Sequence, residues 1–297
     1  KQLDAPITRV EMKVAMDSFK DTTPGNDGIP VSFYKAFWTE IASDLVESMR
    51  ESVDKGELST SQRQALIILL EKKGKPKEEI KNLRPISLLN VDYKIQTKVM
   101  ASRMEKVMHN IISPIQTAYL KGRNVSDNLR LLDDIMHILE YRKEPGLVCG
   151  VDMEKAFDSI SWKYMLRCLE EFGFGKQFQK FVRTIYNKPM SCVLVNGNTS
   201  NYFELERGVR QGDCFSCFLF ILGMEPLIQK INNDSRIKGI KMEGEEIKGI
   251  LFADDGNFIV QDKESVKSIF EVLEEFKEAS GLKVNIDKTE IMKLGAL

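Results

Sequence analysis

Apolar residues recur along the chain in two patterns, and each pattern predicts a different element. Spacings of three or four residues are typical of amphipathic helices, whereas short apolar runs indicate buried strands. The first pattern predicts helices over residues 8–19, 33–49, 93–110, 129–135, 165–169, 178–185, 218–231 and 266–276. The second predicts strands over 65–70, 84–89, 147–151, 191–195, 202–205, 247–252, 258–260 and 283–286. This order indicates an α+β fold whose sheet lies mostly in the second half of the chain.

Turn and capping residues separate these elements. Thr8 and Glu11 have the capping-box spacing that begins a helix. A dense turn signal spans residues 24–30, and Pro145-Gly146 is expected to end the preceding helix. Asn196-Gly197 predicts a hairpin, and Pro226 predicts a kink in the apolar helix. With 297 residues the chain has room for two lobes of ordinary domain size.

The composition is that of a folded protein. Hydrophobic residues make up 42% of the chain and charged residues 29%, which excludes a disordered tail or a fibre. No unbroken apolar run reaches the length of about 18 residues that a membrane span needs, and no leader opens the chain. We therefore expect a protein that is neither secreted nor bound to a membrane. Because the first residue is Lys1, we expect it to be part of something longer.

Cysteine usage indicates a reducing compartment. The 5 cysteines are an odd number scattered through the chain, so we expect an intracellular protein, in the nucleus or the cytoplasm. Cys214 and Cys217 have the spacing of half a zinc site, but the only histidines, His109 and His137, lie far away in sequence. Two interpretations stay open for this cysteine pair: zinc ligands, or small buried side chains.

Positive charge is concentrated in one segment. The whole chain has a formal net charge of −1, but residues 63–106 contain eleven basic and five acidic residues, a local charge of +6. A concentrated basic segment suits a surface that follows phosphates, and a solvated charged face is the alternative.

Three aspartates stand at the ends of predicted strands. Asp152 ends the apolar run 147–151, and Asp254 and Asp255 lie at the tip of a predicted hairpin. If these strands share a sheet, the carboxylates converge at its rim, where their repulsion favours a hard divalent cation such as Mg²⁺. The alternatives are that Asp152 caps the following helix and that Asp255-Gly256 is an ordinary turn.

Several motifs together resemble the reverse transcriptases of non-LTR (LINE-type) retrotransposons. The core motifs are Val151-Asp-Met-Glu-Lys-Ala-Phe-Asp158, Arg207-Gly-Val-Arg-Gln-Gly-Asp213 and Phe252-Ala-Asp-Asp255. Residues 24–28, 83–90, 116–123 and 281–289 resemble motifs of the non-LTR branch. An intron-encoded maturase is a weaker alternative, because residues 152–157 and 24–28 look LINE-like.

The resemblance implies a right-hand polymerase with fingers and palm. Residues 1–146 are expected to form an N-terminal extension and fingers, and residues 147–297 an antiparallel palm sheet flanked by helices, with part of the fingers connection near 160–210. Nothing resembling a thumb follows Leu294-Gly295, so we expect the thumb and any endonuclease to lie elsewhere in a full-length polyprotein. The implied partners are an RNA template, a DNA primer and a deoxynucleoside triphosphate.

The implied chemistry uses two Mg²⁺ ions, with Mn²⁺ as a substitute. By resemblance, Asp152 and Asp254 hold the metals, Asp255 adds charge, and the carbonyl of Met153 is a further ligand. Lys288 matches a lysine that protonates the leaving pyrophosphate.

The nucleotide-binding residues follow from the same resemblance. Phe157 matches an aromatic gate beneath the sugar, with core packing as its alternative. Gln211 and Gly212 match a contact to the incoming nucleotide, with a tight turn as their alternative. Lys72 and Arg84 match residues that clamp the triphosphate, with surface charge as their alternative.

One stretch departs from the family pattern. Residues 214–217 read Cys-Phe-Ser-Cys where the family usually has Pro-Leu-Ser-Pro, so the turn geometry that proline supplies is weakened. Two functions therefore stay open: an RNA-directed DNA polymerase core, or a catalytically silent remnant that acts as an RNA-binding module.

Overall fold

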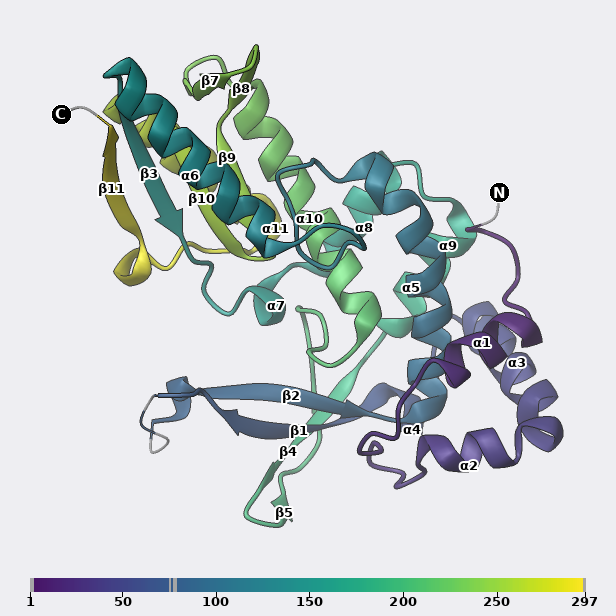
Figure 1. Ribbon diagram of the computed structural model, residues 1–297. Helices are drawn as coiled ribbons and strands as arrows, with labels where there is room; N and C mark the ends of the chain where they lie inside the picture. Colours follow the sequence, from purple (N-terminus) through teal and green to yellow (C-terminus); the bar gives the residue numbers. More distant parts are fainter. Residues whose placement is uncertain (1–2, 75, 77–78, 296–297) are drawn as a thin grey trace. The chain divides into compact units, whose positions relative to one another are not determined.

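The computed structural model describes residues 3–74, 76 and 79–295 (Figure 1). Two compact units are present, and each is assembled from two separate stretches of the chain. Unit 1 comprises Lys1–Lys106 and Leu169–Cys217, and unit 2 comprises Val107–Cys168 and Phe218–Leu297. Three helices run from one unit into the other: α5 (Val91–Ile111), α8 (Trp162–Glu171) and α10 (Cys214–Asn233). The assignment of residues 1–146 and 147–297 to fingers and palm stays a prediction.

Unit 1 combines helices with a mixed sheet. The remaining helices are α1 (Arg9–Asp17), α2 (Val31–Ala36), α3 (Trp38–Lys55), α4 (Thr60–Arg63), the 3₁₀ turn η1 (Ile80–Asn82) and α9 (Lys176–Ile185). The strands are β1 (Gln64–Glu71), β2 (Leu83–Leu89), β4 (Met190–Val195), β5 (Asn198–Thr199) and β6 (Phe203–Glu204). Their order is β2-β1-β4-β5, and β6 pairs with β4. The β1–β2 pair confirms the strands predicted over 65–70 and 84–89.

The single helix predicted over residues 33–49 is wrong. The helix is interrupted at Phe37, which follows the last residue of α2 and precedes Trp38, the first residue of α3. Phe33 and Phe37 are 41% and 48% exposed, and their ring centroids lie 4.9 Å apart. The buried face of α3 instead carries Trp38, Ala42, Val46 and Met49. Because the large indole of Trp38 is buried, the buried face of α3 begins one residue after Phe37, which the predicted single helix would have buried.

The N-terminal segment is held to unit 1 by one buried arginine. Thr8 and Glu11 form the predicted capping box at the start of α1. Arg103, only 4% exposed, lies 2.8 Å from the Glu11 carboxylate and also donates to the carbonyl oxygens of residues 3, 5 and 6. This arginine lowers the pKa of Glu11 to about 2. Removing either partner would remove the charge-assisted hydrogen bonds between the Arg103 and Glu11 side chains.

Unit 2 is built on an antiparallel sheet. Its helices are α6 (Val125–Arg142), α7 (Ala156–Ser159), α11 (Lys263–Ser280) and the 3₁₀ turn η2 (Ile286–Lys288). Its sheet has the order β11-β3-β10-β9, formed by Glu290–Gly295, Pro145–Val151, Asp255–Val260 and Gly249–Phe252. A separate pair joins β7 (Ile240–Met242) to β8 (Glu245–Ile247).

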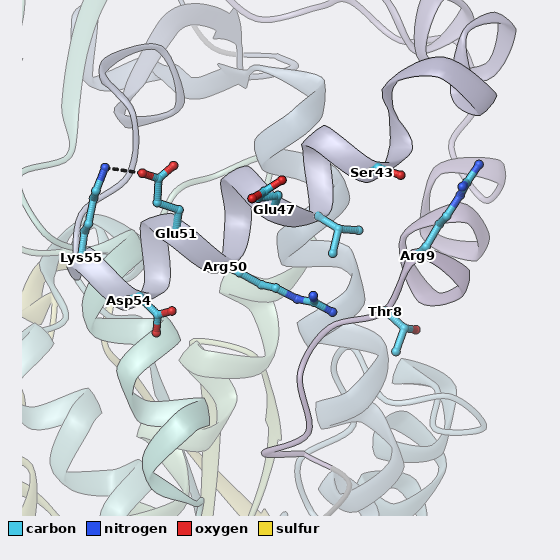
Figure 2. Close-up of a pocket in the computed structure, with 9 residues that line it drawn as sticks. Thr8, Arg9, Ser43, Glu47, Arg50, Glu51, Asp54 and Lys55 are labelled. Atoms are coloured by element: carbon cyan, nitrogen blue, oxygen red, sulfur yellow. Dashed lines mark hydrogen bonds and ion pairs between the residues drawn. The ribbon is translucent and has the colours of Figure 1, made fainter.

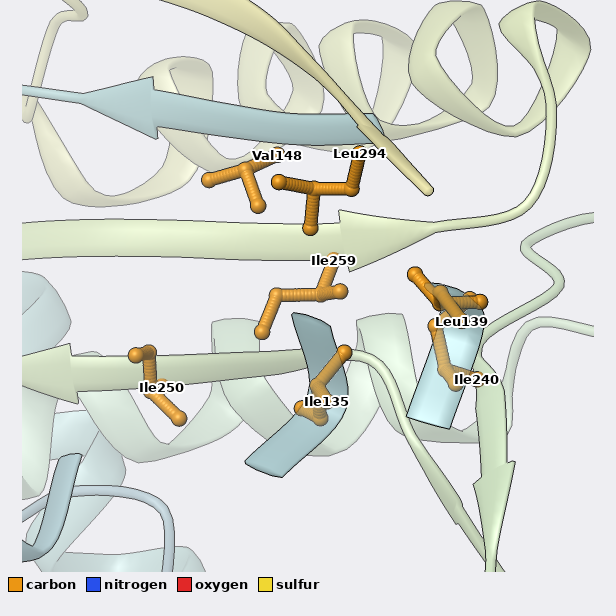
Figure 3. Close-up of a cluster of buried hydrophobic side chains, with 7 residues drawn as sticks. All are labelled: Ile135, Leu139, Val148, Ile240, Ile250, Ile259 and Leu294. Atoms are coloured by element: carbon orange, nitrogen blue, oxygen red, sulfur yellow. The ribbon is translucent and has the colours of Figure 1, made fainter. Parts of the chain in front are cut away.

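A cluster of branched aliphatic side chains packs α6 against this sheet (Figure 3). It contains Ile135, Leu139, Val148, Ile240, Ile250, Ile259 and Leu294. Burying each such side chain contributes about 1.5–3 kcal/mol. The cluster therefore fixes β3, β9 and β10, whose ends carry the three aspartates singled out by the sequence.

Two expectations about the strands and turns are wrong. The strand predicted over 283–286 is absent: Val284 forms only an isolated bridge with Met153, and β11 begins at Glu290. Pro145-Gly146 does not break a helix but opens β3, since α6 ends at Arg142. A first sheet begins at Gln64, but most strand residues lie in the second half of the chain, as the sequence predicts.

Helix α10 is the most apolar helix among those described. Its length and its hydropathy of 1.5 would allow it to cross a membrane, a property that counting unbroken apolar residues misses. However, 72% of that window is buried inside the protein, as in the core helix of a soluble protein. Its composition is therefore weak evidence for a membrane span.

Candidate active site

The ends of two strands in unit 2 bring the aspartates to one edge of the sheet. β3 pairs with β10 in antiparallel register, with Val151 opposite Gly256. One further step along this register places Asp152 opposite Asp255. Residues opposite each other in a strand pair point to the same face of the sheet. Asp254 is the second residue of the two-residue turn between β9 and β10, directly before Asp255. All three carboxylates thus lie at the same end of β3 and β10.

Burial and mutual repulsion raise the pKa of two of these carboxyls. The pKa of Asp254 is raised first by burial and then by the charges of Asp255 and Asp152. The pKa of Asp255 is likewise raised by burial and then by Asp152. The ammonium of Lys288 lowers both pKa values. Carboxyls that repel one another in this way favour a cation that offsets their charge.

Lys288 already supplies one positive charge, since its ammonium forms an ion pair with Asp152. The backbone brings it there. Val284 bridges Met153, and the N–H of Asn285 donates to the carbonyl oxygen of Asp152 at 2.8 Å. The η2 turn follows directly and ends at Lys288. The sequence-predicted residues Asp152, Met153 and Lys288 are therefore neighbours in unit 2.

The aspartates fit a divalent cation in kind, because carboxylate oxygens are the ligands that Mg²⁺ prefers. Across residues 3–74, 76 and 79–295, however, no group of three His, Cys, Asp or Glu side chains is close enough to hold a metal ion. The three carboxylates form a charged edge on which Asp152 is paired with Lys288. The donor chemistry agrees with the prediction, and a formed ligand cage is not seen among these residues.

Phe157 lies on α7 beside two other aromatic rings. Its ring stacks on that of Phe220, with centroids 4.6 Å apart and planes at 19°. Tyr119 meets it edge-on at 6.4 Å. Phe220 is fully buried, whereas Phe157 is partly exposed. One face of the Phe157 ring therefore packs on Phe220, and part of the Phe157 residue is exposed to solvent.

Gln211 and Gly212 lie in unit 1, seated against strand β2. The N–H of Ser87 donates to the carbonyl oxygen of Gln211 at 2.8 Å. Gly212 has φ +112°, and a Cβ at this position would lie 2.7 Å from the carbonyl oxygen of Ser87. Only glycine accepts both this backbone angle and this close approach. Arg84, exposed on the same strand, is three residues from Ser87, about 10 Å along β2.

Two charged residues on either side of this turn anchor it, and sequence reasoning missed them. Arg210 is buried, with its guanidinium carbon 4.9 Å from the centroid of the Tyr93 ring, and it donates to two carbonyl oxygens at the end of α4. Asp213 is also buried and accepts from the Tyr93 hydroxyl at 3.5 Å. Burial raises the pKa of Asp213. In the sequence, the only sign of these anchors is that a charged residue stands directly before and directly after Gln211-Gly212.

The altered stretch after this turn still begins a helix. α10 starts at Cys214 without either proline. Phe215 is fully buried against Phe178, with ring centroids 5.9 Å apart, and its N–H donates to Asp213 at 3.2 Å. Packing and a carboxylate acceptor thus hold the helix start. Burial raises the pKa of the Cys214 thiol to about 12, and among the described residues no third His, Cys, Asp or Glu ligand joins Cys214 and Cys217.

Lys72 lies directly after β1, where its N–H donates to the carbonyl oxygen of Asn82 at 3.0 Å. It belongs to the basic segment 63–106, which presents less charge than its sequence suggests. Arg103 is buried against Glu11, and Arg63 lies 2.9 Å from Glu57. Both acidic partners come from outside the segment. Lys75 and Lys77 of this segment lie outside the residues that the structure describes.

A separate open hollow of about 1120 Å³ lies between α1 and α3 in unit 1 (Figure 2). None of the sequence-predicted site residues lines it. Its wall carries three acidic and three basic side chains, so no single charge dominates. The lining residues are Thr8, Arg9, Ser43, Val46, Glu47, Arg50, Glu51, Asp54 and Lys55.

Comparison with known proteins agrees with this architecture. The family "Reverse transcriptase (RNA-dependent DNA polymerase)" matches residues 71–295. The chain therefore belongs to the reverse transcriptase family. Truncated apo telomerase from Candida tropicalis has a similar fold, with a TM-score of 0.54 and 14% identity over 87% of this chain and 55% of that one. This likeness confirms the expected α+β fingers-and-palm fold class.

The relatives of this chain include non-LTR retrotransposon polyproteins. The chain is 32% identical to the transposon TX1 uncharacterized 149 kDa protein of Xenopus laevis, over 100% of this chain and 23% of that protein. It is 24% identical to the Pol polyprotein of retrotransposable element R2 of Popillia japonica, over 98% of this chain and 40% of that protein. The chain thus spans less than half the length of either relative.

Proposed function

We propose that this chain is the catalytic core of an RNA-directed DNA polymerase that adds deoxynucleotides to a primer 3′-hydroxyl on an RNA template. The observation that carries the proposal is the meeting of Asp152, Asp254 and Asp255 at one end of β3 and β10 in a chain of the reverse transcriptase family. Burial and repulsion at this edge raise the pKa of Asp254 and Asp255, so a cation there is favoured.

In this proposal the three aspartates, with the carbonyl of Met153, hold two Mg²⁺ ions, for which Mn²⁺ can substitute. When bound, such ions lower the pKa of an attacking hydroxyl and neutralise charge on a transferring phosphate. The role of the chain is to keep hard oxygen donors together on a rigid strand pair. The aliphatic cluster beneath the sheet supports that role, because it fixes β3, β9 and β10.

Lys288 is proposed to protonate the leaving pyrophosphate. Its ammonium is a proton donor that contacts Asp152, and the bridge between Met153 and Val284, made by two backbone hydrogen bonds, supports its position. Phe157 is proposed to exclude ribonucleotides by contact with the sugar. The partial exposure of Phe157 and the stacking of its ring on Phe220 support this role.

The unit 1 residues are proposed to bind the nucleotide. Gly212 lets the backbone come close to a partner, as it already does to Ser87, and Gln211 lies beside it. Lys72 and Arg84 are proposed to contact the triphosphate, for which an ammonium and a guanidinium fork are suited. The exposure of Arg84 on β2 supports its part.

Primer extension tests the proposal. The protein is incubated with oligo(dT) on poly(rA), dTTP and either Mg²⁺ or Mn²⁺, beside a variant that combines Asp254→Asn and Asp255→Asn. We expect extension by the wild type and none by the variant. Equal extension by both would refute the metal assignment. Binding of RNA by both without any extension would support the silent RNA-binding module instead.

A further inference from the structure

Ala253 in the turn between β9 and β10 has an unusual backbone conformation. Its φ is +57°, in the left-handed region that residues other than glycine rarely adopt. This residue directly precedes Asp254 and Asp255. A change in its backbone angles would redirect both carboxylates, so some interaction must hold it.

That interaction comes from Gln116, whose side chain is fully buried. Its Oε1 accepts the N–H of Ala253 at 2.9 Å, and its Nε2 donates to the carbonyl oxygen of Ala253 at 3.1 Å. Oε1 also accepts the N–H of Ala118 at 3.1 Å. Two N–H groups facing one atom identify that atom as the oxygen. One side-chain amide thus binds both polar backbone groups of the residue before the aspartates.

The segment that carries Gln116 is itself anchored within unit 2. Arg123 donates to the carbonyl oxygens of Ser113 and Gln116, each at 2.7 Å. The carboxylate of Glu225 accepts the N–H of Ser113 at 3.0 Å and its hydroxyl at 2.6 Å. The N–H of Leu251 in turn donates to the carbonyl oxygen of residue 115 at 2.8 Å. The backbone of Gln116 and of the residues just before it is therefore fixed by Arg123, Glu225 and Leu251.

We propose that Gln116 is a positioning residue for the aspartates, and that it acts by holding the Ala253 peptide groups in the left-handed conformation. The inference rests on the proposed polymerase function. It gives a physical role to the motif 116–123, which stands out in the sequence only by resemblance. Gln116 does not touch substrate in this role, because its amide is occupied by the backbone.

The test removes the amide but keeps the side-chain length, with Gln116→Met in the full-length protein. We expect the rate constant for single-nucleotide incorporation to fall about tenfold or more, with little change in the KM for dTTP, because a misplaced carboxylate impairs the reacting complex rather than nucleotide binding. We also expect hydrogen exchange at the Ala253 amide to become about tenfold faster, since a buried hydrogen bond is lost.

A second substitution separates positioning from general stability. Glycine adopts φ +57° without strain, so adding Ala253→Gly should restore most of the lost rate in Gln116→Met. The matched control is Asn128→Leu, because the buried Asn128 amide donates to the carbonyl oxygen of Leu251 on β9, outside the turn, at 2.9 Å. We expect this control to lower the melting temperature, to keep the rate, and to be unaffected by Ala253→Gly.

Equal rate losses in Gln116→Met and Asn128→Leu, or no recovery with Ala253→Gly, would overturn the inference. Unchanged exchange at Ala253 in Gln116→Met would also overturn it, whether or not the protein polymerises. Asp254→Asn in the same assay distinguishes a failure of the proposed polymerase function from a failure of the inference about Gln116. If Asp254→Asn is as active as the wild type, the proposed catalytic role of the aspartates is wrong. The hydrogen-exchange result at Ala253 still tests the role of Gln116 in that case.

Discussion

Two turns in different units of the molecule adopt left-handed backbone conformations by opposite means. In unit 1, Gly212 has φ +112° and lies so close to Ser87 that a Cβ would clash. In unit 2, Ala253 has φ +57° and is held by the buried amide of Gln116. The first conformation depends on a missing side chain, and the second depends on an added hydrogen-bonding partner.

This difference predicts how each turn responds to substitution. The unit 1 turn is set by sterics, so enlarging its glycine should disturb local packing and ligand binding together. The unit 2 turn presents carboxylates on a scaffold that does not depend on them for packing. Changing those carboxylates should therefore alter chemistry while the fold persists.

The largest expected effect is that of Asp152→Ala. We expect it to reduce primer extension at least about 10²-fold, because it removes a carboxylate at the reacting centre. The melting temperature should change little, since the lost ion pair with Lys288 offsets the relief of repulsion with Asp254 and Asp255. The control is Asp287→Ala, which removes an exposed carboxylate beside Lys288. Normal extension by Asp152→Ala would show that the charged edge has no catalytic role.

The unit 1 turn is tested by Gly212→Ala. We expect a loss of stability of about 1–3 kcal/mol from the strained backbone and the contact with Ser87, together with a raised KM for the nucleotide. Gly197→Ala is the matched control, because Gly197 also has a positive φ, +80°, but a Cβ added there would meet no neighbouring atom within 4 Å. If both variants change the KM equally, the close approach to Ser87 is irrelevant to binding.

Phe157→Val sharpens the comparison within unit 2, where an aromatic ring five residues after Asp152 has either a packing role or a selective one. A sugar gate that is shortened should admit ribonucleotides, lowering the ratio of dNTP to rNTP incorporation about tenfold. Lost contact with Phe220 should also cost about 1–3 kcal/mol of stability. The ratio is measured at a temperature where both proteins are folded. An active variant that discriminates as well as the wild type would assign Phe157 to the core.

The smallest effect concerns the basic segment of unit 1. Lys72→Glu combined with Lys73→Glu should weaken duplex binding and reduce the slope of log affinity against log salt by about 2. The control, Lys263→Glu with Lys267→Glu on α11, makes the same charge change outside the segment. Equal slopes for the two double variants would mean that position does not matter and that only net charge does.

Local patterns predicted the elements around both turns. The β1 and β2 strands, the capping box at Thr8 and the strand that ends at Asp152 each follow from residues close together in sequence. The register of β3 with β10 then puts Asp152 beside the second aspartate pair, as expected for strand-end residues of one sheet.

Other features depend on partners that are distant in sequence, and no local pattern encodes them. Arg103 was counted as surface charge, yet it is buried against Glu11. Gln116 is 137 residues from Ala253, so its two hydrogen bonds to that residue could not be read from spacing. The strand predicted over 283–286 failed for a related reason, since its backbone hydrogen bonds to residues 152 and 154 form a single isolated bridge at Val284.

We propose that the carboxylates at the ends of β3 and β10 hold a divalent cation. The most direct test is Mn²⁺ binding, measured by electron paramagnetic resonance for the wild type and for Asp254→Asn, which keeps the shape of the side chain and removes its charge. We predict that Mn²⁺ binds the wild type and that the variant binds it at least about tenfold more weakly. Equal affinity in the two proteins would contradict the claim.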